Sequence, residues 1–196
     1  TTPPVKTNIT VRIMGPSDQT TLSNSLQSAR TALGYSATLT ITTSTTTSSY
    51  KADDLTGIDV VILMDGGSGA YHSTFGTNLQ NFIDNGGHLI LAAYVWGNAG
   101  AITNFTYATY SPFVYYTSGG SFPVSANGAS LTFTQTHPIS TGLPTALGAV
   151  GQWGAINIAD CPTTTGATVI VQYPSSKSCI AVSYTHLRAH ETLRYL

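Results

Sequence analysis

The amino-acid sequence predicts an α/β protein whose first half forms a doubly wound, mostly parallel sheet. The segment 58–64 is an almost continuous apolar run, as expected of a strand covered on both faces. Segments with helical spacing stand between such strands, and this alternation favours parallel pairing with right-handed crossovers. From Tyr94 onward the chain is loop-rich and aromatic, so the second half is expected to hold short β-strands joined by long loops.

Each expected element has a local signal. Two apolar stripes at helical spacing predict two helices, and a glycine follows each stripe as a stop signal. The stripes are Leu22, Leu26, Ala29 and Leu33 before Gly34, and Phe75, Leu79, Phe82 and Ile83 before Gly86. The expected strands lie at 10–14, 37–41, 58–64 and 88–93, and then at 131–133, 167–173 and 179–182. Residues 42–49 are expected to form a hydroxyl-rich loop.

Length and charge restrict the class of protein. The chain has 196 residues with 7 Lys+Arg and 8 Asp+Glu, a charged fraction of 8%, whereas about a quarter is usual. Nothing in it forms a basic stripe, so nucleic acid is not an expected partner. An apolar run of membrane-spanning length is also missing, so no membrane span is expected. We expect an extended leader over residues 1–7 and a single domain over 8–182.

Several features are typical of a secreted protein. Asn8-Ile9-Thr10 and Asn104-Phe105-Thr106 are N-glycosylation acceptors, so covalent glycans are expected at Asn8 and Asn104. Cys161 and Cys179 are the only cysteines. In an oxidising compartment they could close one disulfide, and two buried thiols are the alternative. With the low charge and abundant hydroxyls, these signals predict an extracellular location.

The last residues differ in chemistry from the rest of the chain. They contain the only glutamate, Glu191, together with His186 and His190, two of the 5 histidines. The eleven residues 182–192 back-translate to a string that resembles the transposon-end adapter of shotgun sequencing libraries. We therefore expect residues 183–196 to be a non-native, adapter-derived tail, and its His and Glu residues are not interpreted as a site.

Three stretches carry a resemblance to a known family: GIDVVILMDGGSG, LQNFIDNGGHLILAAYVWG and THPISTGLP. Together they resemble class I glutamine-amidotransferase-like domains, closest to non-catalytic extracellular and trehalose-utilisation-like versions. The resemblance spans roughly residues 8–181 and implies a flavodoxin-like fold. It also implies one more strand and a helix after residue 181, so the domain is expected to be truncated at its C-terminus.

The residues do not support amidotransferase catalysis. Such an enzyme needs a Cys or Ser on the sharp turn after the strand that ends at Ala93, with a His beside it. This chain has Tyr94-Val95-Trp96 at that position, and residues 1–182 contain no Glu. Cys161 and Cys179 are far from this turn in the sequence. We therefore expect no catalytic residue and no enzyme.

Metal and phosphate sites are the alternatives. Asp65 stands at the carboxyl end of a predicted strand, where ligands of α/β proteins usually bind, and His72 follows in the same loop. With His137 they would be the ligands of a metal-dependent hydrolase, but no metal-ligand spacing supports this. The loop 15–20 stands where a flavodoxin binds phosphate, yet Pro16 removes a donor and Asp18 adds a negative charge. No metal and no cofactor is expected.

An aromatic segment is the most distinctive feature of the second half. Tyr and Trp side chains make good contacts with sugars and protein partners when they are exposed. We expect Phe105 and Phe113 in the core and other aromatic residues at an interface. The candidate binding or interface residues are Asp65, His72, Trp96, Tyr107, Tyr110, Tyr115 and Tyr116.

Taken together, the sequence predicts a non-catalytic, secreted and glycosylated structural protein that self-associates into a homopolymer, as the protomer of an extracellular fibre. The leader 1–6 could pair along the sheet edge of a neighbouring copy. The alternative is a carbohydrate-binding or degenerate hydrolase accessory domain that uses the Asp65–His72 loop and the aromatic segment.

Overall fold

In the computed structural model, the residues described are 6–15, 19–44, 55–64, 74–91, 102–114, 124–125, 131–134, 136–137, 146–147, 153–157, 162–173 and 177–183. Contacts divide the chain into two compact units. Unit 1 comprises 1–95 and 102–105, and unit 2 comprises 96–101 and 106–196. The boundary falls next to Tyr94, where the sequence changes character. The expectation of one domain over residues 8–182 stays a prediction.

Unit 1 is built on a four-stranded parallel sheet in the order β2-β1-β3-β4. The strands are β1 (Asn8–Met14), β2 (Thr38–Ser44), β3 (Val60–Leu63) and β4 (His88–Leu91). The order is that of a flavodoxin-like sheet, with its switch point between β1 and β3. The predicted α/β class with a mostly parallel sheet is therefore confirmed.

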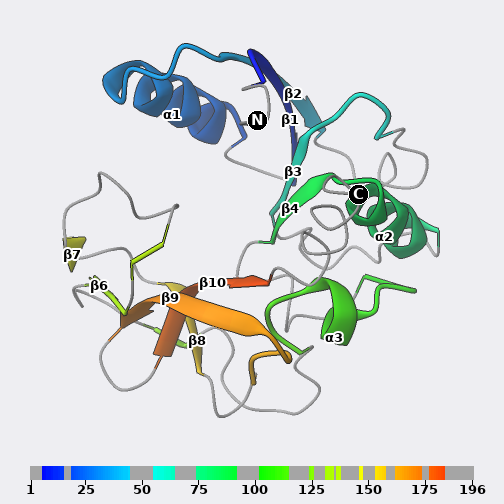
Figure 1. Cartoon of the computed structure of the whole chain (residues 1–196), viewed down its shortest axis with the longest axis vertical. Coiled ribbons are helices and arrows are strands. Elements are labelled where there is room, and N and C mark those ends of the chain that lie inside the picture. Colours follow the sequence, from blue (N-terminus) through cyan, green and yellow to red (C-terminus); the bar gives the residue numbers. More distant parts are fainter. Residues whose placement is uncertain are drawn as a thin grey trace, which may run out of the picture. The chain divides into compact units, whose positions relative to one another are not determined.

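The two main helices lie on opposite sides of this sheet (Figure 1). α1 (Gln19–Ala32) packs Leu22 and Leu26 against the buried side chains of Val11, Ile13 and Ile62. The helix ends in a Schellman motif, in which Gly34 has a φ of 69° and Tyr35 N–H donates to the carbonyl of Arg30 at 3.1 Å. The predicted stop signal at Gly34 is therefore confirmed.

α2 (Phe75–Asp84) buries the stripe Phe75, Leu79 and Phe82, and Gly86, whose φ is 89°, follows its C-cap Asn85. Gly76 lies in its first turn. A Cβ atom on Gly76 would overlap the carbonyl oxygen of Thr103 and come within 2.6 Å of the backbone nitrogen of Phe105. The turn 102–105 therefore packs directly on the helix backbone, which only glycine permits at this position.

Unit 2 contains a six-stranded sheet in the order β5-β8-β10-β9-β6-β7, with antiparallel pairs. Its elements are α3 (Tyr107–Tyr110), β5 (Val124–Ser125), β6 (Leu131–Phe133), β7 (Ala146–Leu147), β8 (Trp153–Asn157), β9 (Ala167–Tyr173) and β10 (Lys177–Ser183). Sequence analysis missed α3, β5, β7 and β8. Among the helices described in the chain, none is long and apolar enough to cross a membrane.

Buried hydroxyl groups hold the segment around α3 to the start of β9. The Thr164 hydroxyl donates to the carbonyl of Ser111 at 2.7 Å, and Thr164 N–H donates to the carbonyl of Pro112 at 3.0 Å. Ser111 and Thr164 are both buried, and Phe113 forms an isolated bridge with Thr163. The Thr164 hydroxyl thereby satisfies the backbone carbonyl of a buried residue.

Several predicted boundaries require correction. β2 extends to Ser44, because Arg12–Met14 of β1 pair with Thr42–Ser44, a stretch that its hydroxyl-rich composition predicts as a loop. β1 begins at Asn8 rather than Thr10, and β10 covers Lys177–Ser183 rather than 179–182. β3 is shorter than the predicted 58–64. The strand after Gly87 is described to Leu91, and its predicted end at Ala93 lies outside the described residues.

Candidate functional site

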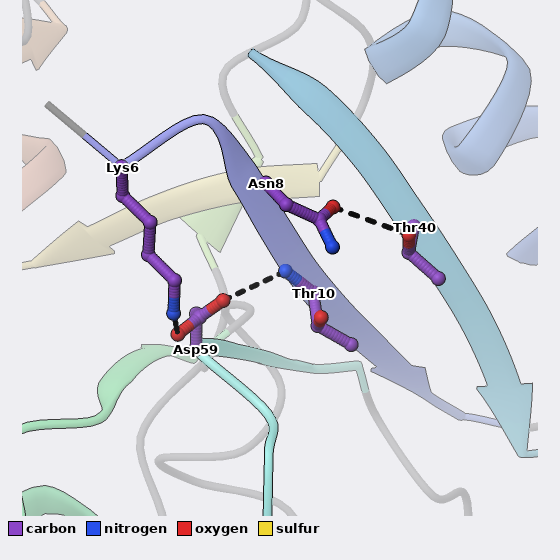
Figure 2. A network of polar contacts seen from close by, with 5 residues as sticks. All are labelled: Lys6, Asn8, Thr10, Thr40 and Asp59. Carbon is purple, nitrogen blue, oxygen red and sulfur yellow. Dashed lines mark hydrogen bonds and ion pairs between the residues drawn. The ribbon is translucent and has the colours of Figure 1, made fainter.

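A polar cluster surrounds the first residues of β1, at the amino end of the parallel sheet (Figure 2). Lys6 forms an ion pair with Asp59, which precedes β3. The second carboxylate oxygen of Asp59 accepts a hydrogen bond from the backbone N–H of Thr10 at 2.8 Å. Asp59 N–H donates to the carbonyl of Thr10 at 2.9 Å, and His88 N–H donates to the carbonyl of Asp59 at 2.9 Å. Asp59 thus links β1, β3 and β4.

The charge state of Asp59 follows from these contacts. Partial burial acts to raise the pKa of its carboxyl group. The hydrogen bonds from Lys6 and Thr10, together with the electrostatic interactions with Lys6 and His88, outweigh burial, so the net pKa lies below its ordinary value of 3.8. The carboxylate is therefore ionised at neutral pH and keeps its pair with Lys6.

The predicted glycan acceptor Asn8 belongs to the same cluster. It is the first residue of β1, its side chain is exposed, and its Oδ1 accepts a hydrogen bond from the Thr40 hydroxyl at 3.4 Å (Figure 2). An N-linked sugar attaches to Nδ2, and the contact with Thr40 is made by the other carboxamide atom, so this contact does not occupy the attachment atom. The glycan itself stays a prediction.

The second acceptor, Asn104, lies in the turn that packs on Gly76. Phe105 N–H donates to the carbonyl of Ile102 at 3.1 Å, which closes a four-residue turn with Asn104 at its third position. Asn104 has a φ of 61°, as a type II turn requires, and it is exposed between the buried residues Ile102 and Phe105. Asparagine tolerates this conformation better than most residues. Both acceptor asparagines therefore are exposed, and both lie among the described residues.

The switch point of the sheet is occupied by the protein's own groups where it is described. The Gln19 side chain, which is buried, donates to the carbonyl of Ser44 at 2.8 Å and also to the carbonyl of Gly15. A Cβ on Gly15 would lie 2.8 Å from the Cβ of Met64, so β1 and β3 approach closely here. Gln19 connects the carboxyl ends of β1 and β2, next to the switch point between β1 and β3 where a flavodoxin-like fold binds ligands.

The predicted aromatic interface is described only in part. Tyr107 is buried, with 6% of its surface exposed, so its expected role as an exposed contact residue is corrected to a core role. Tyr110 is half-buried. Phe105 and Phe113 are buried as predicted. The remaining candidates Asp65, His72, Trp96, Tyr115 and Tyr116 lie outside the described residues.

The metal and disulfide predictions meet the same limit. Across the ranges that the structure describes, no three His, Cys, Asp or Glu side chains converge on a possible metal position. His137 is buried, whereas Asp65 and His72 are not among these residues. Cys179 lies in β10 and Cys161 lies outside the described part, so the disulfide stays a prediction.

Sequence reasoning missed Lys6, Gln19 and Asp59. The sequence does contain a signal for the strands beside them, a pattern of period two. Asn8, Thr10 and Arg12 alternate with aliphatic residues, and Thr38, Thr40 and Thr42 are likewise separated by aliphatic residues. Such alternation predicts strands with one polar face. It is easily overlooked because parallel strands are expected to be apolar on both faces.

Comparison with known proteins supports the fold. A ThuA-like protein from Bacteroides uniformis matches 87% of this chain and 69% of its own chain, with a TM-score of 0.50 and 11% sequence identity. At this identity the likeness shows the fold alone, and it agrees with the flavodoxin-like, amidotransferase-like resemblance of the sequence. No protein-family model and no curated protein matches the sequence.

Proposed function

We propose that this chain is a non-catalytic, secreted and glycosylated structural protein, the protomer of an extracellular fibre. The observation that carries the proposal is the exposure of both acceptor asparagines, Asn8 and Asn104, on described backbone. Attachment of a glycan requires an accessible asparagine, and both acceptors meet this requirement. The low charged fraction of 8% fits an assembly whose copies approach without strong repulsion.

Two further observations favour a structural role over catalysis. The sequence lacks a nucleophile on the turn after the predicted strand at 88–93, and Gln19 bonds the carbonyls of Gly15 and Ser44 next to the switch point. A carboxamide that bonds two backbone carbonyls stiffens the edge where a substrate would bind.

The test is electron microscopy of the secreted protein combined with intact-mass measurement before and after enzymatic removal of N-glycans. The proposal expects ordered filaments and a mass loss on deglycosylation. Asn8→Gln and Asn104→Gln should each remove one glycan, and the double variant should remove both. Discrete, sugar-free monomers would overturn the proposal.

That outcome would favour the carbohydrate-binding or degenerate hydrolase accessory role. A glycan array then separates the carbohydrate-binding role from the hydrolase accessory role. Saturable binding of a glycan that Trp96→Ala abolishes identifies a binding module.

A further inference from the structure

One half of one face of the parallel sheet is polar and exposed. Side chains alternate along a strand, so Asn8, Thr10 and Arg12 of β1 share a face with Thr38, Thr40 and Thr42 of β2, which pair with them residue by residue. We call these six residues the hydroxyl face. Asn8 and the three β2 threonines of this face are exposed, and Thr10 and Arg12 are half-buried.

The apolar side chains behind the hydroxyl face and beside it on β3 are buried or partly buried. The opposite face of β1 and β2 carries Ile9, Val11, Ile13, Leu39 and Ile41, which belong to the core cluster under α1. On the same side as the hydroxyl face, β3 carries Val61 and Leu63, which are fully buried. Parallel sheets are almost always covered on both faces, so an exposed face over two parallel strands is unusual.

The chemistry of the hydroxyl face indicates what can cover it. Four threonine hydroxyls, one carboxamide and one guanidinium are exposed or half-buried there, and Arg12 Nε already donates to the Thr42 hydroxyl at 2.7 Å. The Lys6–Asp59 pair bounds it at the amino end of β1 (Figure 2). An apolar helix would gain little by packing here, whereas a carbohydrate, rich in donors and acceptors, matches these groups.

We infer that the N-linked glycan of Asn8 lies on the hydroxyl face and covers it. Asn8 is itself a member of this face, and Figure 2 shows its carboxamide beside Thr40. A glycan attached there is held at high effective concentration over Thr10, Thr40 and Thr42, so weak hydrogen bonds suffice to dock it. The inference rests on the proposed glycosylation and assigns that glycan a structural role as the cover of the sheet.

The test uses the full chain secreted from a eukaryotic host with isotope-labelled threonine methyl groups. A water-soluble paramagnetic probe reports how accessible each methyl group is. In the glycosylated protein we expect Thr38, Thr40 and Thr42 to be shielded and to become severalfold more accessible in Asn8→Gln. Thr77, exposed on α2, serves as the internal control and should not change. Asn104→Gln should leave the shielding intact.

A second variant separates docking from mere proximity. Thr40→Val keeps the β-branched shape that suits a strand but removes the hydroxyl, so the shielding of Thr38 and Thr42 should fall while the glycan stays attached. Thr77→Val is the matched control. Equal accessibility with and without the glycan would overturn the inference and leave glycosylation standing. An unmodified Asn8 in the secreted chain, detected by mass, would overturn both the docking inference and the proposed glycosylation of Asn8. If only added free oligosaccharide shields the threonine methyl groups, and the attached glycan does not, the inference is overturned. The hydroxyl face would then bind a soluble sugar instead.

Discussion

The two units hold their non-helical, non-strand segments in place by different interactions. In unit 1 the turn 102–105 approaches the backbone of α2 at Gly76, and contact depends on the absence of a side chain. In unit 2 the segment around Ser111 is held by a side-chain hydroxyl, that of Thr164, which bonds a buried carbonyl. The close contact at Gly76 depends on the shape of the backbone, whereas the contact of Thr164 depends on a hydrogen bond. Variants at these positions should therefore fail for different physical reasons.

The largest effect is expected at Gly76. Gly76→Ala places a Cβ against the Thr103 carbonyl and the backbone of Phe105, and backbone atoms cannot move aside as a flexible side chain can. We expect the free energy of unfolding to fall by about 3 kcal/mol, at the upper end of overpacking costs. Urea unfolding measures it, and Thr77→Ala at the exposed next position is the control. An unchanged midpoint for Gly76→Ala would show that the turn does not pack on the helix.

The corresponding change in unit 2 is Thr164→Val, which keeps the shape but removes the hydroxyl. The carbonyl of Ser111 then loses its buried donor. Leaving a buried acceptor without a partner costs about 2 kcal/mol. The same urea titration applies, with exposed Thr165→Val as the control. A cost as small as that of the control would mean that water reaches the Ser111 carbonyl.

Glycines with positive φ allow a direct comparison of the two units. Gly34 ends α1 in unit 1 with a φ of 69°, and Gly166 precedes β9 in unit 2 with a φ of 82°. A Cβ atom added at either position would have no neighbouring atom within 4 Å, so each Ala variant meets only conformational strain. Gly34→Ala and Gly166→Ala should each cost about 1 kcal/mol. Thermal unfolding measures both costs, and a cost near zero for either variant would show that this position tolerates alanine at positive φ without strain.

The difference between the units also explains what the sequence could predict. The stripes ending at Gly34 and Gly86 and the apolar run before Met64 are local patterns, and the elements they predict are present. β8, with Trp153–Asn157, was missed because its pairing with β10 is non-local and its glycine and alanine weaken the strand signal. The predicted end of β2 was too early because Thr42–Ser44 look like a loop until β1 supplies their partners.

The candidate site was less predictable for a related reason. The sequons at Asn8 and Asn104 are visible in the sequence, but their exposure depends on strand register and on the turn at Gly76. The partners of Asp59 are 53 residues away at Lys6 and 49 residues away at Thr10. Pairs so distant in the chain become neighbours only through the parallel order β1-β3, which no local pattern specifies.

The smallest effect concerns the pH dependence of the Lys6–Asp59 pair in unit 1. Because the pKa of Asp59 in the folded protein lies below the unfolded value near 3.8, its stabilising contribution is present above that value and is lost as the pH falls through the folded pKa. The pair is partly exposed, with 63% and 22% of the two side chains accessible, so it is worth at most about 1 kcal/mol. Asp59→Asn should therefore lower stability slightly at pH 7 and flatten the loss of stability below pH 4, roughly where free carboxyl groups titrate. Lys6→Met isolates the ion pair, since it leaves the Thr10 hydrogen bond to Asp59 intact. If Lys6→Met reproduces the whole effect of Asp59→Asn, the backbone hydrogen bond to the carboxylate contributes nothing. If Lys6→Met has no effect, the stabilising contribution of the Asp59 carboxylate comes from that hydrogen bond and not from the ion pair.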